Sequence, residues 1–177
     1  MRLIGKNTIY DPSQWGAYAK WLAVSQDGEF IAVRIMDAGN VWDDERNVFV
    51  YDTNGRLLWT MGKCFGLEKG IAFWPDKYHI LIPGCDPGMN ASGRDGLKNH
   101  KIGSTDYTLP FQDTPVTGIG CELIGVSDSS RYVLSTGKQG IYCIDTLINQ
   151  VTPLPDVVHG LSPYYQATFS VDEKYVA

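Results

Sequence analysis

The sequence predicts an all-β fold of repeated four-stranded antiparallel units, about three complete units and the start of a fourth. Three observations predict it: a hairpin phrase occurs four times, a second pair of strands follows it, and no segment has a sustained helical period of apolar residues. Because 44% of the 177 residues are hydrophobic, the chain has enough apolar side chains for a buried core.

Each hairpin phrase consists of apolar residues, a short polar turn that usually contains Asp, and then an aromatic followed by more apolar residues. The copies align without gaps and occupy residues 22–33, 71–82, 124–135 and 167–177. Their equivalent residues lie 49, 53 and 43 residues apart, at Ser25, Trp74, Ser127 and Ser170. Periods of about 40 to 50 residues are typical of β-propeller blades, which have four strands each.

A second phrase completes each unit: a strand that ends in Asp, followed by another short strand. In the first unit these strands are residues 48–53 and 56–59. Asn54-Gly55 joins them and suits a type I′ turn, because both residue types tolerate positive φ. The third unit has residues 141–146 and 150–154, and the second, where the pattern is weaker, has residues 102–106 and 108–111.

The repeats predict a partial β-propeller over residues 21–177, preceded by an N-terminal segment, residues 1–20, that could add one closing strand. Its units cover about 21–69, 70–120, 121–163 and 164–177. The alternative is an antiparallel sandwich, which also has short strands and Asp or Gly turns at regular spacing. Two different phrases that recur in the same order favour blades, because a sandwich has no reason to repeat its strands in groups of four.

The units resemble WD-repeat propeller blades over roughly Trp21 to Ala177. The likeness rests on the Asp that closes each third strand, in Tyr51-Asp52, Thr105-Asp106 and Ile144-Asp145. The WD-repeat pattern has Trp-Asp there and a Gly-His pair before the blade, and this chain lacks both at those positions. Trp42-Asp43 spells the dipeptide but lies between the predicted second and third strands. These departures leave open a more distant propeller type, including the quinone-cofactor and the bacterial surface-repeat propellers.

Three units and the start of a fourth predict an incomplete ring. Propellers close with about four blades or more, because each blade covers its apolar face with its neighbour. An open arc would leave apolar blade faces and an exposed strand edge in water. We therefore expect either that the chain is a piece of a longer propeller or that copies self-associate through the open blade edges.

Charge and composition exclude several classes of partner. With 15 Lys and Arg against 20 Asp and Glu, the chain lacks the concentrated positive field that nucleic acid or an anionic membrane requires. No apolar stretch is long enough to cross a bilayer. The cysteines are widely scattered, which indicates reduced packing residues rather than a zinc site: Cys64, Cys85, Cys121 and Cys143. We expect a cytoplasmic protein without a cofactor.

The candidate partner-binding residues lie in long loops on one face of the predicted blades, because long loops on a rigid scaffold usually carry binding. They are Trp42, Asp43, Asp44, Glu45, Arg46, Asp86, Arg94, Asp95 and His159. The loop of residues 37–46 combines an aromatic with carboxylates and could hold a basic peptide or a cation; the alternative is a solvated acidic loop. Residues 84–100 form the second insertion, which fails the spacing of an EF-hand calcium loop.

A catalytic function has little support in the sequence. His79, His100 and His159 stand apart, and no nucleophile-elbow, zincin or phosphate-loop motif is present. We expect His79 to pack in the core and His100 and His159 to be exposed in loops. Core packing is also expected for Phe30, Trp59, Trp74, Tyr132 and Tyr175, and a contact surface for Trp15, Trp42, Tyr164 and Tyr165.

The predicted function is a non-enzymatic binding or scaffold module for a protein partner. The alternative is a propeller enzyme, a hydrolase, lyase-like or quinone-dependent, with an axial metal or cofactor site. Convergence of Asp37, Asp86 and His159 on one axial pocket would favour the enzyme.

Overall fold

The computed structural model describes residues 18–36, 48–61, 70–84, 96–104, 106–116, 122–137, 140–154 and 167–177. Within these residues the chain has strands and turns but no helix. The strands form three four-stranded sheets, each antiparallel throughout and each in the order of the sequence or its reverse. The predicted all-β class and the three complete blades are confirmed.

Each predicted unit corresponds to one sheet. The first sheet consists of β1 (Tyr18–Val24), β2 (Phe30–Met36), β3 (Val48–Asp52) and β4 (Leu57–Met61). The second consists of β5 (Ala72–Phe73), β6 (His79–Gly84), β7 (Gly96–Lys101) and β8 (Tyr107–Thr108). The third consists of β9 (Leu123–Val126), β10 (Tyr132–Gly137), β11 (Gly140–Asp145) and β12 (Gln150–Pro153).

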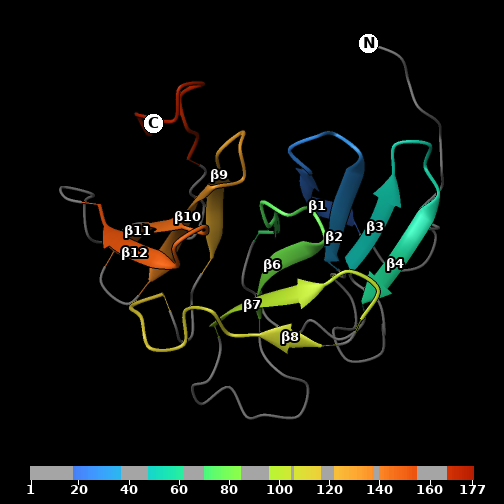
Figure 1. The fold of residues 1–177 in the computed structure, drawn as a ribbon, viewed down its shortest axis with the longest axis horizontal. Helices are drawn as coiled ribbons and strands as arrows, with labels where there is room; N and C mark the ends of the chain where they lie inside the picture. The colour runs from blue at the N-terminus through green and yellow to red at the C-terminus, as the bar shows by residue number, and fades with distance from the viewer. Residues whose placement is uncertain are drawn as a thin grey trace.

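The three sheets fan out from a common middle. Figure 1 shows β4, β8 and β12 at the periphery of the arc and β1 and β9 towards its centre. The start of a fourth unit follows the third sheet, where an isolated antiparallel bridge joins Phe169 to Val176. The described residues therefore form an incomplete ring of blades, as the repeat predicts.

Each of the four hairpin phrases forms a turn, and the four turns have the same hydrogen-bond pattern. In the first, the Ser25 N–H donates to the Phe30 carbonyl at 3.0 Å and the Gly28 N–H donates to the Ser25 carbonyl at 2.8 Å. The equivalent pairs of bonds recur in the other three turns. The fourth residue of each turn has a positive φ, at Gly28, Lys77, Ser130 and Glu173. Only the first of these is glycine, so the turn is held mainly by its hydrogen bonds and not by the residue that occupies the left-handed position.

The turn between β3 and β4 differs from the predicted type I′. Gly55 has a φ of 81°, but Asn54 is not in the left-handed region, whereas type I′ requires both. The Asp52 carboxylate accepts hydrogen bonds from the N–H groups of Asn54 and Arg56 at 3.0 and 2.9 Å. The Asp52 N–H also donates to the Arg56 carbonyl at 3.0 Å, so the turn between the strands contains three residues. The pairing of β3 with β4 also shifts register between Val50 and Tyr51, where Leu58 of β4 is the extra residue of a bulge.

The third strand of the second sheet lies earlier in the chain than predicted. It is β7, Gly96–Lys101, whereas the sequence pattern predicts residues 102–106. Ile102 and Gly103 lie instead in the turn that follows, where the Ser104 N–H donates to the Lys101 carbonyl at 3.1 Å. The reason is that β7 carries Lys98, Asn99 and His100, so it lacks the apolar alternation by which a strand is recognised in sequence.

Two apolar clusters fill the spaces between neighbouring sheets. One joins the first and second sheets and consists of Ala32, Val48, Val50, Ile71, Phe73, Ile80 and Ile82. The other joins the second and third and consists of Ala72, Leu81, Leu97, Phe111, Val116, Leu123, Val133, Tyr142 and Ile144. Phe30 and Trp59 pack against the first cluster and Trp74 against the second, as predicted. Tyr132 is half-buried and its ring centroid lies 6.3 Å from that of Phe169.

A buried cation also ties the first sheet to the second. Arg34, on β2, is 2% exposed, and its guanidinium donates to the Gly70 carbonyl at 3.2 Å and the Pro83 carbonyl at 3.1 Å. The guanidinium carbon lies 5.4 Å from the ring centroid of Trp21, within the range of a cation–π contact. These partners, which come from both sheets, offset the cost of burying the Arg34 charge.

Candidate interaction surface

The loop residues predicted to bind a partner lie outside the described residues, so the structure does not place them. They are Trp42, Asp43, Asp44, Glu45, Arg46, Asp86, Arg94, Asp95 and His159. The same is true of Asp37, Trp15, Tyr164 and Tyr165. The proposed axial convergence and the predicted aromatic contact surface therefore stay predictions.

Two histidines have environments that differ from those predicted. His100 lies in β7, is 5% exposed, and its ring centroid is 5.3 Å from that of its cross-strand neighbour Tyr107. It is thus a buried strand residue and not an exposed loop residue. His79, expected in the core, is 32% exposed, and its Nδ1 lies 2.6 Å from the Asp76 carboxylate. The polar turn of the second hairpin draws this ring out of the apolar cluster.

A charged clasp joins the hairpin turns of the first two blades. Lys77 Nζ donates to the carboxylates of Asp27 and Glu29 at 2.5 Å each, and it lies 5.5 Å from the Phe30 ring centroid. The bond from Lys77, together with that from the Glu29 N–H, lowers the pKa of Asp27 to about 2. The same two carboxylates raise the pKa of Lys77. The fourth residue of one turn therefore holds the third and fifth residues of the preceding turn.

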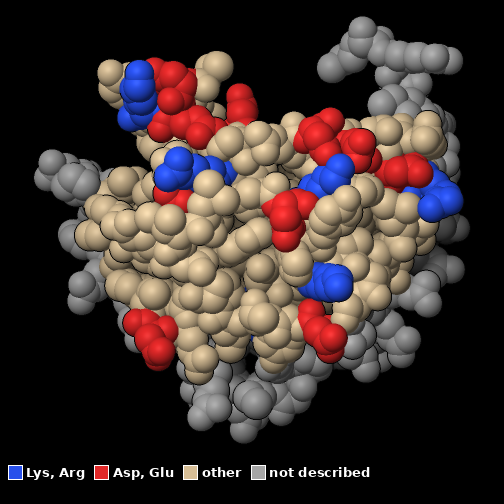
Figure 2. Space-filling view, in the orientation of Figure 1, with Lys and Arg blue, Asp and Glu red and all other residues tan. Residues whose placement is uncertain are grey.

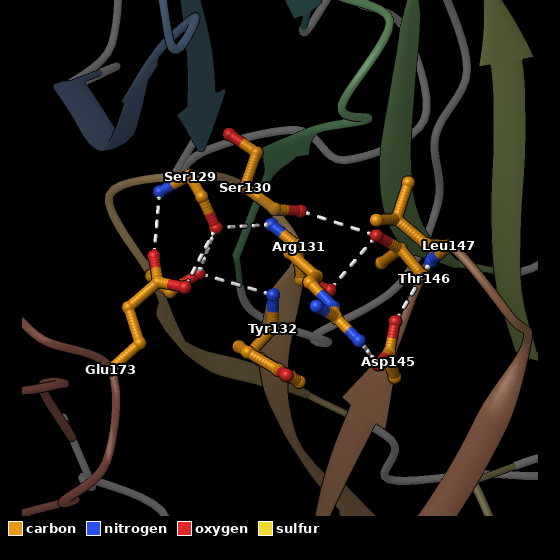
Figure 3. Close-up of polar contacts among 9 residues, drawn as sticks. Ser129, Ser130, Arg131, Tyr132, Asp145, Thr146, Leu147 and Glu173 are labelled. Atoms are coloured by element: carbon orange, nitrogen blue, oxygen red, sulfur yellow. Dashed lines mark hydrogen bonds and ion pairs between the residues drawn. The ribbon is translucent and has the colours of Figure 1, made fainter.

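A related clasp joins the third blade to the start of the fourth (Figure 3). The Glu173 carboxylate accepts hydrogen bonds from the Ser129 N–H at 2.8 Å and the Ser129 hydroxyl at 2.9 Å. Burial raises the pKa of Glu173, but these bonds outweigh burial and the net shift is downward. Like Lys77, Glu173 is the fourth residue of its turn and reaches the third residue of the preceding one.

A second ion pair anchors the turn of the third blade within its own sheet. Arg131 donates to the Asp145 carboxylate from Nη2 at 2.7 Å and from Nε at 3.0 Å. This bond lowers the pKa of Asp145 and raises that of Arg131. Figure 2 shows acidic and basic side chains next to one another in the upper part of the view, where Figure 1 places the hairpin turns. Of the charged contacts on this side, those of Lys77 and Glu173 join neighbouring units, whereas the Arg131–Asp145 pair lies within one sheet.

Uncovered apolar side chains lie on the face of the first sheet that points away from the second. Leu22 and Val24, on β1, are 65% and 50% exposed. Their cross-strand partners on β2 are Val33, which is 5% exposed, and Ile31, which is half-buried. We call these four residues the outer face. Side chains two residues apart on a strand share a face, so the set forms one side of the sheet.

The repeat shows that the outer face is built like a blade interface. In the second unit the residues equivalent to Leu22 and Val24 are Ile71 and Phe73, which are 4% and 1% exposed because the first sheet covers them. The residues equivalent to Ile31 and Val33 are Ile80 and Ile82, and both belong to the same cluster. The outer face thus has the composition of a surface that another blade covers. The sequence alone could have identified this face, because the gap-free alignment of the hairpin phrases pairs its apolar residues with those of the second unit.

The comparison with solved structures identifies the architecture. A TolB from Acinetobacter baumannii superposes with a TM-score of 0.53 at 16% identity, over 91% of this chain and 37% of that one. The fold is a partial β-propeller. A putative TolB from Agrobacterium tumefaciens gives a TM-score of 0.56 at 13% identity, over 91% of this chain and 53% of that one. A prolyl endopeptidase gives 0.54 at 18% identity, over 89% of this chain and 23% of that one.

These likenesses show the fold and not the activity, because identity is low and the chain spans about a quarter to a half of each neighbour's length. Neither a protein-family model nor a curated protein matches the sequence. Among the described residues, no three His, Cys, Asp or Glu side chains are grouped so as to hold a metal ion. The same part of the chain contains no helix long and apolar enough to span a bilayer.

Proposed function

We propose that this chain is a non-enzymatic β-propeller module that binds a protein partner through the outer face of its first blade. The observation that carries the proposal is the contrast in burial between Leu22 and its repeat equivalent Ile71, at 65% and 4% exposed. A side chain that is buried in one copy of a repeat and open in another marks a surface made to be covered.

The physical reason is the cost of leaving such a face in water. Burial of apolar surface contributes roughly 25 cal/mol per Å², and large exposed apolar patches usually mark interaction sites. Leu22 and Val24 lie on the same face of β1 and are both exposed, so a partner would cover them together, next to the half-buried Ile31. A rigid sheet beneath the patch keeps the entropic cost of binding low, because few side chains or loops need to be ordered.

Two finer features belong to this proposal. We retain the likeness to WD-repeat blades because the Asp that closes β3 and β11 fixes the turn that follows it, where Asp52 and Asp145 each accept backbone hydrogen bonds. A cytoplasmic location is also part of the proposal, and the free thiol of Cys143 is consistent with it, because thiols are kept reduced in the cytosol.

The alternative of a propeller enzyme rests on Asp37, Asp86 and His159, which lie outside the described residues. Nothing in the geometry of the described blades favours it over binding. Protein binding is the proposal that the described contacts support.

A photo-crosslinking experiment tests the proposal. A benzoylphenylalanine is placed at Val24 and, as the matched control, at Leu147, which is 59% exposed in the turn between β11 and β12. Irradiation of the intact chain in cell extract should give defined protein adducts from position 24 and none from position 147. The same yield from both positions would show that apolar exposure alone captures proteins, and the proposal would be wrong.

A further inference from the structure

The structure assigns Asn54 as a site of spontaneous chemical modification, at which the side-chain amide is lost to the next backbone nitrogen, and Asp52 as the residue that controls the rate. This inference is independent of the proposed function. It rests on Asn54-Gly55, which is the only Asn-Gly pair in the sequence, and on the hydrogen bonds of the turn that contains it.

The reaction at such a pair requires water and no enzyme. The backbone nitrogen of Gly55 loses its proton to solvent and attacks the side-chain carbonyl carbon of Asn54, which closes a cyclic imide. The side-chain nitrogen takes up a proton from solvent and leaves as ammonia. Water then opens the imide at either carbonyl. One product is aspartate; the other is isoaspartate, in which the main chain runs through the side chain and is longer by its methylene carbon.

Two features of the turn favour this reaction at Asn54. The Asn54 side chain is exposed, so water reaches the amide and the imide. The next residue is glycine, which has no side chain to obstruct the approach of its nitrogen. The turn between β11 and β12 provides a comparison, because Asn149 is also exposed but is followed by Gln150. Asn149 should therefore keep its amide under conditions in which Asn54 loses its own.

The folded turn holds the attacking nitrogen in a hydrogen bond. The Gly55 N–H donates to the Asp52 carbonyl at 2.9 Å, and the Asp52 N–H donates to the Arg56 carbonyl at 3.0 Å. We expect this nitrogen to react only in the fraction of molecules in which the turn is locally open. Folding should therefore slow the loss of the amide relative to the unfolded chain.

The side chain of Asp52 stabilises the closed turn further. Its Oδ1 accepts hydrogen bonds from the Asn54 N–H at 3.0 Å and the Arg56 N–H at 2.9 Å, one on each side of Gly55. The Arg56 side chain itself is 78% exposed and lies 3.8 Å from the carboxylate, so its ion pair contributes little. Loss of the two hydrogen bonds should raise the open fraction roughly fivefold to thirtyfold.

Modification of this turn has a consequence for the contact between blades. Isoaspartate lengthens the main chain within a turn of three residues, so the hydrogen bonds that close the turn cannot all form. β4 starts at Leu57, directly after the turn, and its Trp59 and Met61 pack against the cluster between the first two sheets. The modified chain should therefore unfold more readily than the unmodified chain.

Peptide mass spectrometry of the intact chain tests the assignment of the site, after incubation at mildly alkaline pH in buffer or in concentrated guanidinium chloride. Cleavage after Arg46 and Arg56 releases the peptide that contains Asn54, and its fragmentation separates Asn54 from Asn47. We expect amide loss at Asn54 in the denaturant and at least about tenfold slower loss in the folded chain. No loss is expected at Asn149 over the same period.

Two variants test the role of Asp52, with circular dichroism to confirm that each is folded. Asp52→Ala removes both side-chain acceptor bonds, so the folded variant should lose the Asn54 amide roughly fivefold to thirtyfold faster than the unaltered chain. Asp52→Asn is the matched control. Its side-chain oxygen can accept the same two bonds, but a neutral acceptor makes weaker ones, so its rate should lie between the other two.

Three results would overturn the proposal. Equal rates at Asn54 in the folded and the denatured chain would show that the turn does not protect this residue. Equal rates at Asn54 and Asn149 in the denaturant would remove the assignment of the site. Rates in the folded D52A and D52N variants that match the unaltered chain would show that Asp52 does not control the reaction.

Discussion

Replacement of Ile71 by Ala and of its repeat equivalent Leu22 by Ala should have very different effects on stability. The two side chains are isomers of equal size, they occupy the same position of the hairpin phrase, and they differ in exposure, at 4% and 65%. The difference between the two substitutions therefore measures how much coverage by a preceding blade contributes to the free energy of unfolding.

The expected magnitudes follow from burial. Ile71 lies in the cluster between the first two sheets, and truncation of a buried Ile to Ala costs about 2 to 5 kcal/mol through lost transfer energy and the cavity that remains. Full burial of a Leu contributes about 1.5 to 3 kcal/mol, and Leu22 has lost only about a third of its exposure, so Leu22→Ala should cost about 0.5 to 1 kcal/mol.

Urea unfolding followed by tryptophan fluorescence measures both values, since Trp21 and Trp59 pack against this cluster. The comparison is made at a protein concentration low enough to keep the chain as single copies, and the urea dependence must stay the same between variants. Equal losses from the two substitutions would show that the first blade does not cover Ile71, and the assignment of the outer face would fail with it.

Three further predictions concern the contacts between blades. Because the pKa of Asp27 is lowered to about 2 from 3.8, its contribution is complete above about pH 4 and is lost as the pH falls towards 2, so Asp27→Asn should flatten acid unfolding monitored by circular dichroism across that interval. Gly125→Ala would bring a Cβ within 2.5 Å of the Ala167 carbonyl, and a loss of about 1 to 3 kcal/mol in thermal unfolding is expected, whereas an unchanged midpoint would mean that the fourth unit does not pack there. Arg34→Leu leaves two backbone carbonyls without this donor and should cost at least about 2 kcal/mol in urea unfolding, a result that a neutral variant would contradict.

The hairpins and the blade count could be predicted from the sequence because they depend on local signals. Each turn combines a polar stretch, a residue in the left-handed region and apolar flanks, and this pattern recurs with little change from Ser25 to Tyr175. The spacing of the copies then gives the four-strand unit. These features follow from hydrogen bonds within six residues, which sequence patterns record well.

Features that depend on neighbouring strands or sheets could not be predicted. In β7 the buried residues include Lys98, whose Nζ lies 4.7 Å from the Tyr107 ring centroid, and His100, which contacts the same ring. Polar side chains stabilised by a cross-strand aromatic break the apolar alternation, so the sequence pattern misplaces the third strand of the second blade. The prediction of a core position for Tyr175, made because it occupies the aromatic position of the repeat, is wrong: it is 70% exposed, whereas its equivalents Phe30 and Tyr132 contact the unit that follows each of them.

Photo-crosslinking from position 24 in cell extract tests the proposed function most directly. The proposal is that a protein partner covers the outer face of the first blade, where Leu22 and Val24 are 65% and 50% exposed. It predicts defined protein adducts from position 24 and none from the control position, Leu147, which is 59% exposed. Equal yields from the two positions, or no adduct from position 24, would contradict it.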